Sequence, residues 1–180
     1  MFTSDFMERT IQIPDGINID VDKFKIKVAG PKGTLQRDFY NPIFSKDVVV
    51  KKADNKVIIS SESKKRKIKA MLGTIESITN NMIEGVKKGY EVKMKIVYMH
   101  FPFTIKITGK EIVISNFLGE KLSRKTKIVG DCNVEVKGDE ITITGINKED
   151  VGQTAANLEK VTWIRSRDRR VFQDGIFRTA

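Results

Sequence analysis

Apolar and polar residues alternate over several short stretches of the chain, and each group of these stretches is followed by a segment with helical spacing. In residues 24–30 apolar positions alternate with lysines, a pattern that predicts a β-strand with one buried face. Residues 48–60 contain two β-rich runs around the polar turn Ala53-Asp54-Asn55, which is typical of a hairpin. Apolar residues then recur at steps of three and four and predict a helix with one apolar face: Ile68, Met71, Leu72, Ile75, Ile78, Thr79 and Met82.

The same order of elements occurs twice. Residues 103–109 match residues 24–30, from the first phenylalanine to the closing glycine. Residues 134–144 match the hairpin, with Lys137-Gly138-Asp139 as its turn. A second segment with helical spacing begins 83 residues after the first, and its apolar positions are Val151, Ala155, Leu158 and Val161. The chain is therefore predicted to contain two copies of one unit.

Each copy is predicted to fold as an antiparallel-rich β-sheet with one helix packed on one face, an α+β fold with two tandem duplicated domains. Because one helix covers only one sheet face, the lysine-bearing face is expected to stay in solvent. Gly85 and Gly89 are expected to end the first helix, so the predicted domains are residues 1–88 and 89–180. The residues expected to cap the helix N-termini are Ser61 or Ser63 and Asn147.

Composition narrows the class of protein. The chain has 180 residues, of which 39% are hydrophobic, and no run reaches the roughly 18 apolar residues that would cross a membrane. Its first residues lack the basic start and apolar run of a signal peptide. Cys132 is the only cysteine, so an internal disulfide and a cysteine-built zinc site are excluded. A cytosolic protein, or a nuclear one in transit, is expected.

Charge indicates the kind of partner. The net charge is +10 and the isoelectric point is near 9.6. Residues 1–22 hold five acidic residues and one arginine, so the rest of the chain carries +14. A field of this sign attracts polyanions, and phosphate neutralisation dominates affinity for nucleic acids. The alternative at this point is a basic surface with no partner.

No catalytic or metal chemistry emerges from the pattern. His100 and Cys132 are the only residues of their types, which leaves little for the usual nucleophile–base pairs, and the acidic residues are too scattered for a metal site. Residues 30–34 superficially suggest a phosphate-binding loop, but a strand pattern follows them instead of a helix, so a turn between strands is predicted. The chain is not expected to be an enzyme or to need a cofactor.

Three basic clusters remain as candidates for binding. The first opens the first helix, where cations oppose the helix dipole; it contains Lys64, Lys65, Arg66, Lys67 and Lys69. Bound phosphates would compensate that cost, but a merely solvated basic face explains the cluster as well. The second lies around Gly119 and contains Lys121, Arg124, Lys125 and Lys127.

The third cluster is a tail at about residues 165–180. It uses arginine and no lysine, with aromatic residues between; its members are Arg165, Arg167, Arg169, Arg170 and Arg178, interleaved with Trp163, Phe172 and Phe177. Guanidinium groups suit phosphates and stack on bases. We therefore expect an extended tail that becomes ordered on RNA; the alternative is a tail packed on its own domain.

At these residues the sequence resembles the universal large-subunit ribosomal protein six family, called protein nine in eukaryotic ribosomes. The resemblance covers nearly the whole chain, and its motifs occur in order: Gly30 to Leu35, Asn80 to Val86, Val97 to Pro102, Asn116 to Lys121 and Asp168 to Phe177. The motifs resemble those of the eukaryotic and archaeal branch of the family, and the length fits a eukaryotic member. Phe177 departs from the pattern, because many relatives have tyrosine there.

The resemblance implies two similar domains and a structural, non-catalytic role in the large ribosomal subunit. It implies binding to rRNA near the stalk base and the sarcin–ricin loop, where translational GTPases dock, with neighbouring ribosomal proteins as further partners. By position it assigns RNA contact to Asn116, Gly119, Lys121, Arg124, Lys125, Arg165, Arg167, Arg169, Arg170, Phe172 and Gly175. Lys64 to Lys67 are a possible secondary contact.

The expected location is the cytoplasmic ribosome, with nuclear or nucleolar transit during assembly if the source is eukaryotic. Neither a membrane nor an independent homo-oligomer is expected. The rival hypothesis is a free-standing adaptor that binds an acidic protein or a membrane surface. It shares the positive field, but it predicts neither the arginine-rich tail nor the family motifs.

Overall fold

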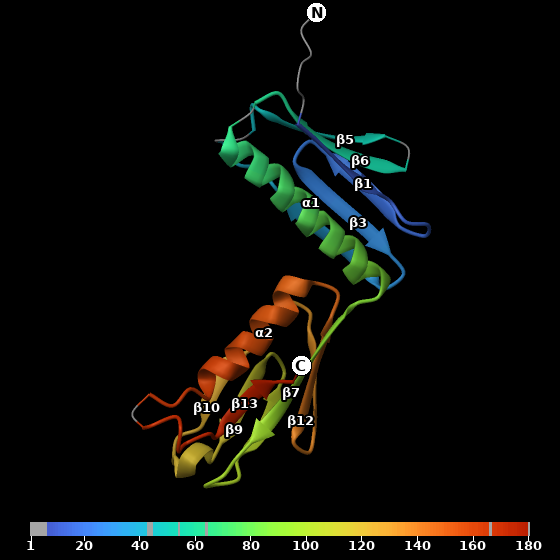
Figure 1. Ribbon diagram of the computed structural model, residues 1–180. Coiled ribbons are helices and arrows are strands. Elements are labelled where there is room, and N and C mark those ends of the chain that lie inside the picture. The colour runs from blue at the N-terminus through green and yellow to red at the C-terminus, as the bar shows by residue number, and fades with distance from the viewer. Residues whose placement is uncertain (1–6, 43–44, 54, 64, 166, 180) are drawn as a thin grey trace, which may run out of the picture. The chain divides into compact units, whose positions relative to one another are not determined.

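The computed structural model describes residues 7–42, 45–53, 55–63, 65–165 and 167–179. The chain divides into two compact units, residues 1–89 (unit 1) and 90–180 (unit 2). Each unit combines antiparallel strands with one α-helix (Figure 1). The predicted α+β class and the tandem duplication are therefore confirmed.

The described part of unit 1 holds two three-stranded sheets and the long helix α1. One sheet has the order β1-β6-β5 and the other β2-β3-β4. The elements are β1 (Met7–Gln12), β2 (Asn18–Asp22), β3 (Lys25–Gly30), β4 (Gly33–Asp38), β5 (Val48–Ala53), β6 (Lys56–Ser61) and α1 (Arg66–Lys87). Two sheets, where one was predicted, let the single helix cover apolar side chains from both.

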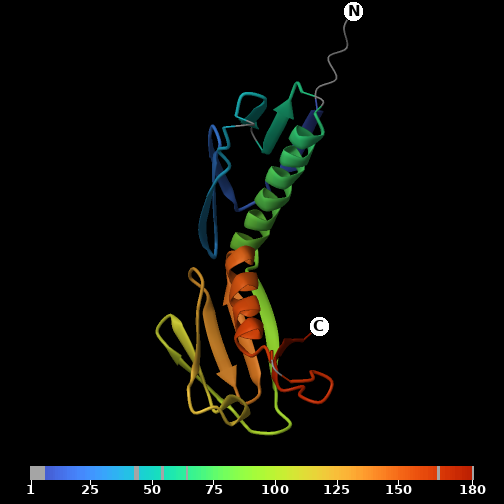
Figure 2. The same cartoon turned by 90° about the vertical axis from the view of Figure 1, so that its left-hand side faces the viewer.

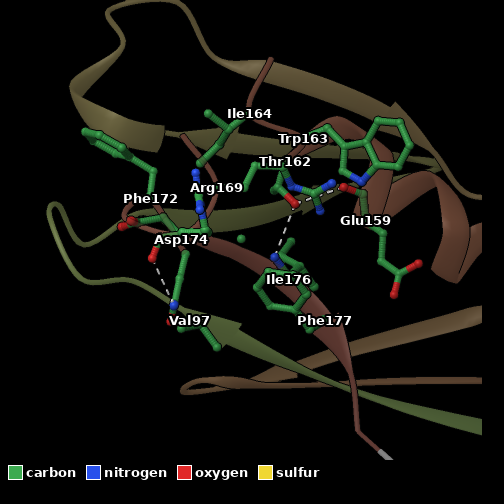
Figure 3. Close-up of a pocket in the computed structure, with 13 residues that line it drawn as sticks. Val97, Glu159, Thr162, Trp163, Ile164, Arg169, Phe172, Asp174, Ile176 and Phe177 are labelled. Atoms are coloured by element: carbon green, nitrogen blue, oxygen red, sulfur yellow. Dashed lines mark hydrogen bonds between the residues drawn. The ribbon is translucent and has the colours of Figure 1, made fainter. Parts of the chain in front are cut away.

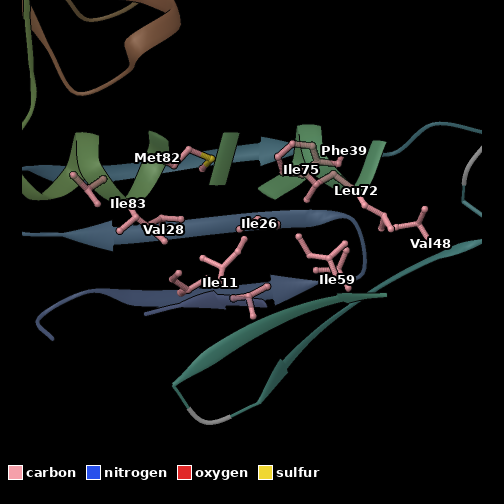
Figure 4. Close-up of a cluster of buried hydrophobic side chains, with 14 of the residues drawn as sticks. Ile11, Ile26, Val28, Phe39, Val48, Ile59, Leu72, Ile75, Met82 and Ile83 are labelled. Atoms are coloured by element: carbon pink, nitrogen blue, oxygen red, sulfur yellow. The ribbon is translucent and has the colours of Figure 1, made fainter. Parts of the chain in front are cut away.

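The core of unit 1 lies between α1 and the strands (Figure 4). Leu72 and Ile75 are one turn apart on the same helix face, and they are fully buried together with Ile26 and Ile59 from the two sheets. Burial of each such side chain stabilises the fold by about 1.5–3 kcal/mol. The three- and four-residue spacing in the sequence is thus the part of α1 that faces the core.

The described part of unit 2 repeats this plan and adds to it. Its larger sheet has the order β11-β12-β7-β13 and its smaller sheet β10-β9-β8. The elements are β7 (Tyr90–Val97), β8 (Thr104–Thr108), β9 (Glu111–Ser115), a 3₁₀ turn (Phe117–Gly119), β10 (Arg124–Lys127), β11 (Asn133–Lys137), β12 (Glu140–Gly145), α2 (Lys148–Val161) and β13 (Gly175–Arg178). Buried side chains of α2, such as Leu158, pack with Met94 and Ile114 from the two sheets.

The predicted turns and hairpins are confirmed. β5 pairs with β6, and β11 pairs with β12, in antiparallel register; Asp54 of the first turn lies outside the described residues. Gly30 lies opposite Gly33 in the β3–β4 hairpin, so residues 30–34 form a turn between strands and not a phosphate-binding loop.

The two helix starts differ from each other. Asn147 caps α2 as predicted, because its side chain accepts a hydrogen bond from the Glu149 N–H at 3.1 Å. The prediction that Ser61 or Ser63 caps α1 is wrong. The N-cap is Lys65, which makes no side-chain cap bond, whereas Ser61 is buried at the end of β6 and its Oγ accepts the Ser63 N–H. Ser61 belongs to the strand and lies four residues before the N-cap.

Candidate nucleic-acid interface

The candidate site is centred on a loop of unit 2, residues 162–165 and 167–174, which runs from the end of α2 to β13; Ser166 lies outside the described residues. Figure 2 shows this loop standing out beside α2. It leads into β13, where Gly175 lies opposite Val97 and Ile176 opposite Ile96 of β7. Ile176 is 1% exposed. The expectation of an extended tail is therefore wrong for residues 175–178, because burial and strand pairing hold them on their own unit.

Two buried side chains fix the ends of the loop. Thr162 Oγ1 accepts a hydrogen bond from the Ile176 backbone N–H at 3.2 Å, so the two ends of the loop are joined. Asp174 is 3% exposed and accepts the backbone N–H groups of Met99 at 2.8 Å and His100 at 3.1 Å. Its Oδ2 also lies 2.7 Å from His100 Nδ1. The loop is thereby tied to the segment after β7.

These bonds determine the protonation of Asp174. Burial by itself would raise its pKa, but the hydrogen bonds from the His100 ring and the two backbone N–H groups hold the pKa below its usual value. A carboxylate is therefore kept charged in a buried position. The lone histidine of the sequence acts here as a structural partner, in agreement with its sequence context.

The arginines of the loop are exposed, and aromatic rings hold several of them. The Arg167 guanidinium lies 4.7 Å from the centroid of the Phe172 ring, which in turn stacks on His100 at 4.4 Å. The Arg169 guanidinium lies 5.7 Å from the Trp163 centroid. Arg170 pairs with Asp168 at 3.3 Å. Cation–π contact restricts these long side chains while leaving their donors available to phosphates.

Arg124 differs from the other predicted contacts because the protein uses its donors internally. Its guanidinium makes two bonds to the Glu120 carboxylate, at 2.6 and 2.8 Å. It also donates to the carbonyls of Val161 and Trp163 and lies 4.5 Å from the Phe117 centroid. The Arg124 hydrogen bond holds the pKa of Glu120 below its usual value. Arg124 thus connects β10 to the start of the loop.

The other predicted contact residues of unit 2 fall into two groups: some fix the backbone conformation, and others carry exposed charge. Asn116 and Gly119 have positive φ angles of 63° and 76°, which asparagine and glycine tolerate best, and Asn116 Nδ2 donates to the Pro102 carbonyl. Lys121 and Lys125 are exposed. Gly175 is buried, and a Cβ there would lie 3.1 Å from the Phe177 ring.

One exposed lysine near the predicted contact Lys125, Lys106, was not among the residues predicted from the sequence. Lys106 on β8 and Lys125 on β10 both lie opposite Val113, one from each neighbouring strand. Lys106, Lys125 and Lys127 are all exposed. The alternation in residues 103–109 already placed Lys106 on the exposed face, but the pairing of β10 with β9 could not be read from it.

The first basic cluster belongs to unit 1. Lys65, Arg66 and Lys67 are exposed where α1 begins, while Lys64 lies outside the described residues. No acidic residue occupies the first turn of α1. This cluster does not share a unit with the loop and is a separate candidate.

A cavity of about 700 Å³ opens beneath the loop (Figure 3). Its lining includes Trp163, Arg169, Phe172 and Phe177. Among the described residues no group of histidine, cysteine and acidic side chains could hold a metal ion. No helix in the described ranges is long and apolar enough to span a membrane.

The family match and the relatives found by comparison with known proteins all point to one family. The family described as Ribosomal protein L6 matches residues 8–89 and 101–175, one segment in each unit. A large ribosomal subunit protein uL6 from Methanosarcina mazei is 47% identical over 169 residues, covering 94% of both chains. The uL6 protein of Methanobrevibacter smithii is 48% identical over 93% of this chain and 92% of its own. That of Staphylothermus marinus is 45% identical, with 93% and 90% covered.

Proposed function

Because the chain belongs to the ribosomal protein L6 family, we propose that it is a structural constituent of the large ribosomal subunit and binds rRNA through unit 2. Membership of this family agrees with the expectation of a non-enzymatic role. The relatives named above are archaeal, so they give no support to the nuclear or nucleolar transit expected for a eukaryotic source.

The observation that carries the proposal is the arginine loop, whose two ends are anchored by hydrogen bonds. It is held at both ends by Thr162 and Asp174, and it presents the exposed residues Arg165, Arg167, Arg169 and Arg170. A preformed array of guanidinium groups suits the fixed phosphate spacing of folded RNA, which proteins recognise largely by shape. Ordering the loop in advance lowers the entropy lost on binding.

The predicted contacts take two roles in this proposal. The residues that touch RNA directly are Lys121, Lys125, Arg165, Arg167, Arg169 and Arg170. The residues that shape and position this surface are Asn116, Gly119, Arg124, Phe172 and Gly175. Arg124 is assigned to the second group because its guanidinium is bonded to Glu120 and two carbonyls. Lys65 to Lys67 of unit 1 remain a possible secondary contact.

We propose the finer location from the family resemblance alone. It lies near the stalk base and the sarcin–ricin loop, where the protein would support the region at which translational GTPases dock. Neighbouring ribosomal proteins would be its protein contacts. Crosslinking of the assembled subunit, with the crosslinked lysines and arginines mapped onto rRNA, tests this location directly.

The surface itself is tested by replacing Arg167, Arg169 and Arg170 with alanine. All three side chains are exposed, so the melting temperature should change little, while incorporation into large subunits measured on sucrose gradients should fall at least several-fold. The matched control replaces Lys51, Lys52 and Lys56, three exposed lysines of unit 1, and should incorporate normally. A purely soluble pool of the unmodified protein would instead favour the adaptor hypothesis.

A further inference from the structure

Trp163 is the only tryptophan of the chain and stands between two hollows of unit 2. The larger is the cavity of about 700 Å³ beneath the loop, a volume typical of sites for small molecules. The smaller, of about 360 Å³, is lined by Trp163 together with Arg124, Lys160, Val161 and Arg165. One indole ring therefore borders both an aromatic-lined cavity and a basic one.

The larger cavity can admit a flat ring. Trp163 is 51% exposed, so about half of the residue is accessible from solvent. The Arg169 guanidinium lies 5.7 Å from the indole centroid. A planar group stacked between them needs about 3.5 Å on each side, about 7 Å in all, which an outward movement of the exposed Arg169 side chain by about 1.3 Å provides.

The cavity also offers a polar group suited to the edge of such a ring. Glu159 contributes to the same lining (Figure 3), and its Oε1 lies 3.7 Å from Arg178 Nε. A carboxylate accepts hydrogen bonds from the amino and imino groups of nucleobases. An apolar side chain of a protein partner would make no use of the cationic rim.

We infer that the cavity holds a single nucleobase turned out of an RNA helix, stacked between Trp163 and Arg169. The adjoining phosphates lie in the smaller hollow, against Lys160 and Arg165. The inference rests on the proposed RNA-binding function and assigns to it one nucleotide-sized site. Turning a base out of a helix costs the least where the base is already unpaired, so the site selects RNA with a bulged nucleotide.

The test uses the full chain and three RNA hairpins of equal length. One has a fully paired stem, one has a single unpaired adenosine in the stem, and one carries an abasic residue at that position. Stacking of a base on an aromatic side chain predicts about tenfold tighter binding of the bulged hairpin than of the other two. Trp163 fluorescence should be quenched by the bulged hairpin only, and the sole tryptophan makes this signal specific.

Two variants complete the test, with affinity measured by anisotropy of labelled RNA. Trp163→Ala should lose the preference for the bulged hairpin and keep the affinity for the paired one. The matched control Tyr40→Ala removes an aromatic side chain of unit 1 that is 63% exposed and should keep the preference. Circular dichroism establishes that both variants are folded.

The outcomes separate this inference from the function on which it rests. Equal binding of all three hairpins, without quenching, would leave the RNA-binding surface in place and overturn the nucleobase site. The same conclusion follows if Trp163→Ala retains the preference, or if a glutamate-rich peptide containing one phenylalanine quenches Trp163 as strongly as the bulged hairpin. Failure of all three hairpins to bind at low salt would overturn both proposals.

Discussion

The sheet β2-β3-β4 of unit 1 and the sheet β10-β9-β8 of unit 2 have two corresponding strands and differ in the third. By sequence, β3 and β4 correspond to β8 and β9, but unit 1 adds β2 beside β3, whereas unit 2 adds β10 beside β9. The added strands have opposite charge: β2 reads Asn-Ile-Asp-Val-Asp and β10 reads Arg-Lys-Thr-Lys. The charge of each exposed face is therefore set by a strand that the duplication does not share.

The strand register shows which residues lie opposite the exposed lysines in each sheet. In unit 1, Lys25 lies between Asp22 and Asp38 on the neighbouring strands, and Lys27 lies opposite Asp20. In unit 2, Lys106 and Lys125 lie on either side of the neutral Val113. Opposite charges on paired strands largely cancel one another. The lysine alternation is alike in the two copies, but of these two sheets only β10-β9-β8 has exposed lysines that lie opposite a neutral residue, on both sides of it.

The largest effect is expected on the stability of unit 2. Asp174→Ala leaves the Met99 and His100 N–H groups without their acceptor, and the loss of a buried, charge-assisted acceptor costs about 2–4 kcal/mol. Urea denaturation followed by Trp163 fluorescence measures this. The control in unit 1 is Asp38→Ala, which removes one exposed bond from the Tyr40 N–H and should cost less than about 1 kcal/mol. Equal losses would show that the loop is not specially fixed.

The same carboxyl group should make unit 2 sensitive to acid. The pKa of Asp174 is lowered in the folded state, so its contribution is complete above the ordinary pKa of about 3.9. It is lost as the pH falls through the folded pKa, because the unfolded state binds the proton more readily. In Asp174→Asn the pH dependence of the free energy of unfolding between pH 5 and about 2 should flatten. An unchanged profile would assign acid sensitivity to other groups.

The next effect concerns RNA affinity and tests the two faces against each other. Replacing Lys106 and Lys125 with glutamine should lower the slope of log affinity against log salt by up to about 2, since each phosphate contact contributes about 1. Replacing Lys25 and Lys27 should leave the slope unchanged because neighbouring aspartates already balance them. Filter binding over a salt series measures both. Equal changes in the two variants would contradict the comparison.

The smallest effect is the converse change in unit 1. Asp20→Asn with Asp22→Asn removes two exposed negative charges opposite Lys27 and Lys25. The unit 1 face then resembles that of unit 2, and affinity for a paired RNA hairpin should rise about twofold at low salt. The gain should vanish at high salt as screening increases. A decrease would show that β2 itself contributes to binding.

The hydrophobic periodicity of the sequence was sufficient to predict individual strands and helices. The alternation in residues 24–30 and the helical spacing from Ile68 gave β3 and α1, because these periods follow from strand and helix geometry. β13 was missed, since its four residues pair with β7, about 80 residues earlier in the chain. No periodicity within residues 175–178 carries that information.

The candidate site shows the same limit. The sequence identified the arginine-rich segment correctly as exposed and basic, because composition alone carries that signal. It could not separate Arg124 from its neighbours, whose side chains look equivalent in sequence. The carbonyls that Arg124 meets, those of Val161 and Trp163, lie 37 and 39 residues further along the chain. Register between strands, which decides whether a lysine is balanced, is likewise a property of the fold.

The pairing of β13 with β7 has a consequence for synthesis on the ribosome. β7 is the first strand of unit 2 to be made and β13 the last of the strands that the structure describes. Domains fold as units while the chain emerges, so unit 1 can form early, but the loop of unit 2 is closed only when residues 175–178 are available. An incomplete chain would therefore carry the arginines without the arrangement that presents them. The loop can therefore take the arrangement seen in the structure only after residues 175–178 have been made and have paired with β7.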